Sequence, residues 1–282
     1  MKNGLVLEGG AMRGLWTAGV TDVIMEHDVW PDGLIGVSAG AAFGCNIKSR
    51  QIGRAIRYNM RFANDARYSG WRSLLTTGNY FNARFGYHTV PKKYDIFDDN
   101  AFNQNPMEFI VVCTDVETGK AVYQPLSEAN YDTYEWIRAS ASMPLVSKVV
   151  KLDGRKLLDG GVADSIPLEY FESIGYRHNV VILTQPKGFI KSQNSLFPLM
   201  RMALRKYPAF VEALANRPNM YNQELAYVAK AEEEGRCLVI RPDDWIPIGH
   251  ISHDPDEMLR VYELGRKVGE RYIEQIKDFY KI

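Results

Sequence analysis

The chain has little cysteine and no excess of either charge. Its 282 residues include 3 Cys, namely Cys45, Cys113 and Cys237, and no two of them are spaced as C-x-x-C. This sparse, odd set fits reduced thiols better than a disulfide framework or a zinc site, so no cysteine-bound metal is expected. Lys+Arg and Asp+Glu both number 34. A net charge of +0 excludes an overall basic field that would attract nucleic acid or anionic membranes.

Long hydrophobic runs are also absent. No segment reaches the length of a membrane span, and the apolar run before Glu8 is too short for a signal peptide. Together with the cysteine usage, this predicts a cytoplasmic protein. Hydrophobic residues make up 46% of the chain. That composition suits one large α/β domain or two small ones, and we predict a single domain over residues 1–282.

Strand-like and helix-like segments alternate along the chain. Strands are expected at 4–10, 33–38, 179–186 and 236–243, with hairpins at 107–125 and 149–161, and helices at 15–29, 39–49 and 254–280. This alternation predicts a three-layer α/β/α fold with a mainly parallel sheet. Residues 57–105 are rich in aromatics and show no clear period, which is typical of a lid or pocket wall, or of a surface insertion.

Ser38 lies in a G-x-S-x-G sequence directly after the second predicted strand. The residues two positions away are Gly36 and Gly40, and Ala39 allows the turn to continue into a helix. Such a strand-to-helix turn exposes a serine hydroxyl as a nucleophile and needs small neighbours. An ordinary β-α loop without catalytic function can contain the same G-x-S-x-G sequence, so the motif alone leaves both interpretations open.

The first predicted strand ends in the glycine-rich sequence "EGGAMRG". The spacing of Gly9, Gly10 and Gly14 fits neither a P-loop nor a dinucleotide fingerprint. What remains is a group of backbone amides for an oxyanion, formed by Gly9, Gly10, Ala11, Met12, Arg13 and Gly14. Arg13 either adds positive charge near the site or pairs with a carboxylate that braces the loop.

The catalytic base has two kinds of candidate. An α/β-hydrolase would use a histidine late in the chain, but the surroundings of His178, His250 and His253 resemble no site, and surface or capping roles are expected for them. Asp159 ends a predicted hairpin strand and is followed by Gly160 and Gly161, which let another chain segment approach. A buried aspartate can act as a general base, although D-G is also a common turn.

Taken together, the glycine-rich loop, G-x-S-x-G and D-G-G resemble the bacterial patatin-like phospholipases, which are Ser-Asp dyad acyl hydrolases. Further segments resemble them in the same order, so the similarity covers about residues 4–190, followed by a less distinctive helical part at about 195–282. These segments are "LEGGAMRGLWTAGVTDVI", "RYSGWRSLLTTGNYF", "VVCTDVETGKAVY", "RASASMPLVSKVV", "LLDGGVADSIP" and "VVILTQP".

The resemblance implies that Ser38 is the nucleophile, Asp159 the proton acceptor and the amides of residues 9–13 the oxyanion hole. Two positions depart from the family pattern. Ala11 stands where a third glycine is frequent and restricts the backbone of the oxyanion loop, and Ser165 stands where asparagine is common, which affects local hydrogen bonding.

The sequence therefore predicts a phospholipase A or lipid esterase that needs no cofactor. The alternatives are a non-catalytic lipid- or acyl-binding protein and an α/β-hydrolase with a late histidine. One segment, 196–214, carries Met200, Ala203, Leu204, Tyr207 and Val211 on one helical side. Its basic residues indicate weak peripheral membrane contact or, as for most such segments, a core-facing helix that Pro208 interrupts. Head group, chain length and oligomeric state leave no signal in the sequence.

Overall fold

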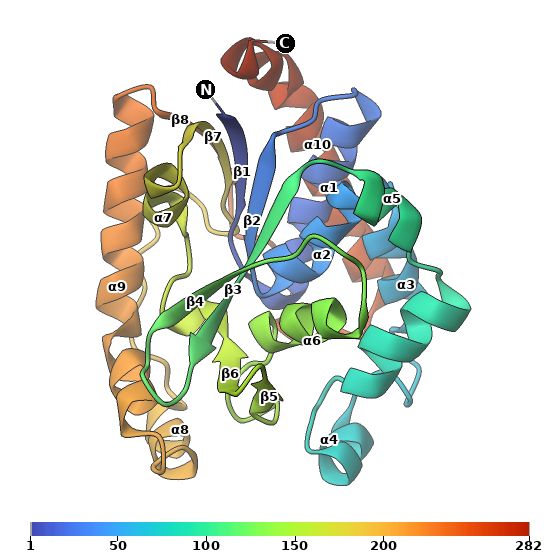
Figure 1. Ribbon diagram of the computed structural model, residues 1–282, viewed down its shortest axis with the longest axis vertical. Coiled ribbons are helices and arrows are strands. Elements are labelled where there is room, and N and C mark those ends of the chain that lie inside the picture. Colours follow the sequence, from blue (N-terminus) through green and yellow to red (C-terminus); the bar gives the residue numbers. More distant parts are fainter. Residues whose placement is uncertain (1, 282) are drawn as a thin grey trace.

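The chain is built around one sheet whose parallel strands are connected through helices (Figure 1). The computed structural model describes residues 2–281. In this part of the chain eight strands form the sheet: β1 (Lys2–Leu7), β2 (Gly33–Val37), β3 (Glu108–Asp115), β4 (Ala121–Pro125), β5 (Val150–Leu152), β6 (Arg155–Asp159), β7 (Tyr176–Ile182) and β8 (Cys237–Ile240). The neighbours β3-β2-β1-β7-β8 are parallel, whereas β4, β5 and β6 pair in antiparallel fashion. The predicted fold class is confirmed.

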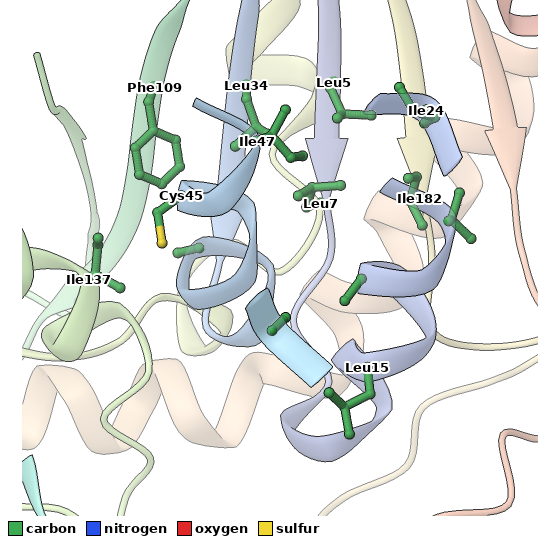
Figure 2. Close-up of a cluster of buried hydrophobic side chains, with 14 of the residues drawn as sticks. Leu5, Leu7, Leu15, Ile24, Leu34, Cys45, Ile47, Phe109, Ile137 and Ile182 are labelled. Carbon is green, nitrogen blue, oxygen red and sulfur yellow. The ribbon is translucent and has the colours of Figure 1, made fainter. Parts of the chain in front are cut away.

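Helices cover both faces of the sheet. One face carries α1 (Gly14–Glu26), α2 (Ala39–Lys48), α6 (Tyr131–Ser140) and α10 (Pro255–Tyr280), and the other carries α7 (Leu168–Ser173) and α9 (Pro208–Glu233). The strands supply both cores because side chains alternate between the faces. Leu5 and Leu7 pack toward α1 and α2 (Figure 2), whereas Val6 packs with α7 and α9.

The pairing of β3 explains how two distant segments come to meet. Residues Ile110–Val112 of β3 pair with both β2 and β4, so these two strands occupy opposite edges of β3. Cys113 and Thr114 pair with both β4 and β6, so β6 lies on the same edge as β2. Val37 is opposite Val112, and Asp159 is opposite the next residue, Cys113. The carboxyl ends of β2 and β6 therefore face each other.

The aromatic segment between β2 and β3 is largely helical, although its sequence shows no clear period. It forms α3 (Arg54–Phe62), α4 (Trp71–Thr77), a π-helix (Phe85–Tyr94) and α5 (Asp99–Gln104). Its apolar contacts come from an aromatic cluster instead of a periodic stripe: Phe62 and Phe85 meet edge to face with ring centroids 5.4 Å apart. The sequence shows no clear period here because aromatic packing of this kind leaves no helical stripe.

The last third of the chain joins the same sheet. β8 pairs with β7, and α10 packs along α1. α8 (Phe197–Ala203) ends before Pro208, which begins α9, as the proline predicted. The predicted terminal helix is also present, with the Asp254 side chain accepting hydrogen bonds from the first amides of α10. Within residues 2–281, no helix combines the length and hydropathy that a bilayer crossing requires.

Candidate active site

Ser38 lies at a sharp turn between β2 and α2. Its backbone has φ 55° and ψ −119°, a conformation that a non-glycine residue adopts only under strain. The two glycines of the motif make this turn possible: a Cβ on Gly36 would lie 2.6 Å from the Gly40 carbonyl oxygen, and one on Gly40 would overlap the Leu7 carbonyl oxygen. The sequence therefore folds locally into the predicted elbow.

The structure brings Ser38 and Asp159 together at the meeting point of β2 and β6. The Ser38 hydroxyl donates a hydrogen bond of 2.7 Å to Asp159 Oδ2. Both residues are almost withdrawn from water, with exposed fractions of 7% for Ser38 and 6% for Asp159. A hydroxyl in contact with a buried carboxylate can lose its proton to that carboxylate as it attacks an electrophile.

Several groups hold the Asp159 carboxylate. The Gly161 amide donates to Oδ1 at 2.9 Å, opposite the bond from Ser38. Burial raises the pKa of Asp159, while the Ser38 hydroxyl, the charge of Arg217 and the Gly161 amide act in the opposite direction. Gly160 lies directly against the Val112 carbonyl, so a side chain at this position would push the loop away from β3. The two glycines thus allow the close approach that their sequence predicted.

The glycine-rich loop lies beside Ser38. A Cβ on Gly9 would be 2.9 Å from the Ser38 Cβ, so the loop backbone touches the elbow. The N–H of Arg13 donates to the Gly10 carbonyl at 3.1 Å, and the N–H of Gly14 is bonded within the same turn. The amides of Arg13 and Gly14 are therefore engaged elsewhere, which narrows the candidate oxyanion donors to residues 9–12. Ala11 adopts φ 50°, the left-handed conformation that glycine adopts more easily.

Arg13 faces an amide side chain. With the Gln185 oxygen turned toward it, Arg13 Nη1 and Nη2 donate to this oxygen at 3.3 and 3.2 Å. Arg13 makes no ion pair with any carboxylate within residues 2–281, so the idea that it pairs with a carboxylate was wrong. The loop is instead tied to the strand end after β7, where the Thr184 hydroxyl donates to the Gly9 carbonyl at 3.1 Å.

A pocket of about 1150 Å³, including its open mouth, begins at Ser38 and Met12. The aromatic segment supplies the largest share of its wall, which supports the pocket-wall interpretation of residues 57–105. The side chains that line it there are Tyr58, Asn59, Tyr68, Asn79, Phe81, Asn82, Ala83, Tyr87, Val90, Pro91 and Phe97. A largely apolar space that opens beside a nucleophile suits a hydrocarbon chain.

The three late histidines occupy different surroundings. His178 lies against Phe279, and His253 bonds the Tyr80 hydroxyl and the Ala63 carbonyl. His250 lines the pocket, which its sequence surroundings did not predict, and burial together with nearby cationic side chains lowers its pKa. Among the described residues, the hydrogen-bond partner of the Ser38 hydroxyl is Asp159 and not a histidine.

Two further residues, Ser140 and Arg217, support the site, although neither belongs to a catalytic motif in the sequence. The Ser140 hydroxyl accepts the Ser38 N–H at 2.9 Å and donates to the Val112 carbonyl at 2.6 Å, so it fixes the elbow to β3. Arg217 on α9 donates to the Gly161 carbonyl. Neither residue is near its partner in the sequence, so no local spacing could have indicated these contacts.

Comparisons with known proteins reveal relatives of this chain. Residues 5–172 match the family model of patatin-like phospholipases, and residues 207–281 match a model described as a domain of unknown function (DUF6363). The uncharacterized protein YjjU of Escherichia coli (strain K12) is 30% identical over 279 residues, which cover 95% of this chain and 76% of that protein.

More distant relatives differ in length. Lysophospholipase nte1 of Aspergillus niger is 26% identical over 305 residues, covering 97% of this chain but 18% of that enzyme. The chain thus spans about a fifth of the length of these lysophospholipases. The crystal structure of VipD from Legionella pneumophila superimposes with a TM-score of 0.45 and 12% identity, over 97% of this chain and 67% of that chain.

Proposed function

This chain belongs to the patatin-like phospholipase family, and we propose that it hydrolyses carboxylic esters of lipids through Ser38 and Asp159. One observation carries the proposal: the Ser38 hydroxyl donates to the buried Asp159 carboxylate at 2.7 Å, beside a loop of backbone amides. The lysophospholipase named among the relatives supports a lipid ester as the substrate.

The reaction proceeds in two steps. Ser38 Oγ attacks the acyl carbonyl carbon while Asp159 Oδ2 takes the hydroxyl proton, and this proton then passes to the alcohol that leaves. Water next attacks the acyl-Ser38 ester, with Asp159 again accepting a proton and returning it to Ser38. The amides of Gly9 to Met12 stabilise the negative oxygen that develops in both steps.

The acyl chain occupies the pocket that begins at Ser38. Its aromatic and aliphatic wall gives it a larger apolar than polar surface, which favours a hydrocarbon over a sugar or a nucleotide. Because the pocket recognises the hydrocarbon part, both phospholipids and simple esters are candidate substrates.

A serine-directed fluorophosphonate probe and a set of p-nitrophenyl esters of graded chain length test the proposal. We expect covalent labelling of Ser38 and ester hydrolysis, and we expect Ser38→Ala to lose both while melting as the unmodified protein does. Ser142→Ala is the matched control, because its buried hydroxyl in the same pocket bonds to the Arg138 carbonyl and not to Asp159. Labelling without turnover would instead support the non-catalytic lipid-binding alternative.

Peripheral membrane contact forms part of the proposal, although on different residues from those expected. Met200, Leu204 and Tyr207 are half-buried against a hydrophobic core cluster, so most of the stripe predicted for segment 196–214 faces the protein. The exposed apolar side chains of this segment are Leu196, Leu199 and Met202.

A second group of exposed apolar side chains lies at the same end of the molecule. Trp71 and Leu75 project from α4, and Figure 1 places α4 and α8 at the end toward which β1 and β2 run. Arg201 and Arg205 are exposed on or beside α8. Apolar side chains with neighbouring cations suit an anionic bilayer surface.

Flotation with anionic liposomes at low salt tests this contact. We expect Leu199→Ser with Met202→Ser to reduce flotation, and Leu264→Ser, an exposed leucine on α10, to leave it unchanged. Absence of flotation for the unmodified protein would remove the membrane proposal. Cytoplasmic localisation stays a prediction from composition.

A further inference from the structure

Helix α9 holds the loop that carries Asp159 at two points. Arg217 Nε donates to the Gly161 carbonyl, and the Glu224 carboxylate accepts the N–H groups of Ser165 and Ile166, each at 3.1 Å from one of its oxygens. Arg217 and Glu224 are seven residues apart, which places them on the same face of the helix. One helix face thus fixes the loop from Gly161 to Ile166.

The contact at Gly161 is the one closest to the reacting atoms. Gly161 donates its own N–H to Asp159 Oδ1 at 2.9 Å, so the position of this residue determines how the carboxylate faces Ser38. A Cβ on Gly161 would lie 3.2 Å from Asp159 Oδ1 and 3.3 Å from Arg217 Nη2. The carboxylate and the guanidinium therefore flank the same residue.

Arg217 also supplies the positive charge near this carboxylate. Burial raises the pKa of Asp159, and the charge of Arg217 lowers it again. The other titratable side chains that face Asp159 are Cys113 on β3 and Tyr87 on the π-helix. Burial raises the pKa of both, so they are neutral at working pH. Within residues 2–281, Arg217 is thus the cation whose charge acts on Asp159.

We propose that Arg217 is a positioning residue that orients the Asp159 carboxylate toward Ser38 and places a positive charge beside it. The inference rests on the proposed Ser38–Asp159 chemistry and extends it to α9, within the segment that matches the domain of unknown function. Residues 207–281 would accordingly complete the active site as well as the fold.

Arg217→Gln in the full chain separates charge from hydrogen bonding, because glutamine can still donate to the Gly161 carbonyl. We expect the acidic limb of kcat against pH, measured with a soluble p-nitrophenyl ester, to move to higher pH. Loss of precise positioning should also lower kcat at the plateau by roughly 10-fold to 100-fold. Arg217→Lys retains the charge, so it should restore the acidic limb to its original pH while recovering the plateau only in part.

Arg241→Met is the matched control. Arg241 also pairs with a side chain of α9, Glu232, but this contact does not involve the Asp159 loop, so its pH profile should be unchanged. An unchanged acidic limb in Arg217→Gln would overturn the inference, even with a lower melting temperature. If Arg217→Gln does not fold, Arg217→Lys is the deciding variant. An acidic limb that is displaced in Arg217→Lys would also contradict the proposed role of Arg217.

Asp159→Asn, measured in parallel, distinguishes two kinds of failure. If Asp159→Asn keeps its activity, the proposed dyad is wrong and the role of Arg217 falls with it. If Asp159→Asn is inactive while Arg217→Gln retains the original pH profile, the dyad stands and only the positioning role is wrong.

Discussion

The two halves of the candidate site are built in different ways. The elbow of Ser38 is built mainly from nearby residues: Gly36 and Gly40 contact each other, and the glycine-rich loop beside them comes directly after the neighbouring strand β1. The loop of Asp159 is held by distant residues. The N–H of Asp159 donates to the Ser142 carbonyl. The next residues of the loop are held by α9, which contacts them with the side chains of Arg217 and Glu224.

This difference determines where each half is vulnerable. A glycine-built turn tolerates no added atom, because backbone lies directly against backbone. In a loop held by side-chain hydrogen bonds, removing one bond costs only the free energy that this bond contributes, so the loop is displaced gradually. Substitutions in the two halves should therefore differ in what they impair.

The largest effect is expected from the Asp159 half. Asp159→Asn keeps the shape of the side chain and removes the proton acceptor, so kcat should fall by about 10²–10⁴-fold. Since burial raises the pKa of Asp159 above 3.8, and only the carboxylate accepts a proton, the rate of the unmodified enzyme should fall as the pH drops through this raised pKa. Steady-state kinetics over a pH series measure both.

Histidine variants provide the control for this prediction. His178→Asn, His250→Asn and His253→Asn should keep their activity if the aspartate acts alone. His250→Asn is the strictest control of the three, because His250 lines the pocket and the other two histidines do not. Loss of turnover in His250→Asn with near-full activity in Asp159→Asn would favour an α/β-hydrolase arrangement. Each variant needs a melting curve beside its rate.

The elbow half should respond to one added methyl group. A Cβ at position 40 would overlap the Leu7 carbonyl oxygen, so Gly40→Ala forces β1 and α2 apart. We expect a loss of about 1–3 kcal/mol in the free energy of unfolding and displacement of Ser38 from Asp159. Urea denaturation measures the first, and the rate of fluorophosphonate labelling measures the second.

Gly249→Ala is the matched control for this substitution. A Cβ at position 249 would have no neighbour within 4 Å, and its φ is outside the left-handed region. The variant should therefore be as stable as the unmodified protein. Equal stability of both variants would mean that the elbow adjusts more easily than the contacts at Gly40 indicate.

Most of the strands and terminal helices were predictable, because their signals are local. The Asp153-Gly154 turn has φ 49° and 73° and closes the hairpin that the two letters predicted. The hairpin predicted at 107–125 likewise corresponds to the antiparallel pair β3-β4. The pairing of β6 with the opposite edge of β3 left no such signal, because a sequence period does not specify which edge of a strand is occupied.

The same distinction applies to the site. Ser38 and Asp159 carry glycine signatures, whereas Ser140 and Arg217 are ordinary residues until the fold brings them to the elbow and the loop. His250 reaches the pocket from a segment between β8 and α10. Long-range contacts of this kind depend on tertiary packing, which single-sequence patterns do not encode.

A smaller effect is expected where a distant side chain supports the elbow. Ser140→Ala removes the acceptor of the Ser38 N–H and the donor to the Val112 carbonyl in a fully buried position. Leaving these groups unsatisfied should cost about 1–3 kcal/mol of stability. Ser49→Ala deletes a similarly buried hydroxyl at the far end of α2 and should leave the labelling rate of Ser38 unchanged. Equal labelling rates in both variants would show that Ser140 does not support the nucleophile.

The smallest effect is expected at Ser165, in the Asp159 half. The Ser165 hydroxyl donates to the Gly161 carbonyl at 2.8 Å, and Arg217 donates to the same oxygen. Ser165→Ala therefore leaves this carbonyl with a charged donor, and the loss of one neutral hydrogen bond should cost about 0.5–1.5 kcal/mol. The acidic limb of the pH profile should not move, because the charge beside Asp159 is unchanged. If Ser165→Ala lowered the rate as much as Arg217→Gln does, the loop would depend equally on both hydrogen-bond donors. The charge of Arg217 would then have no role beyond that of a neutral donor.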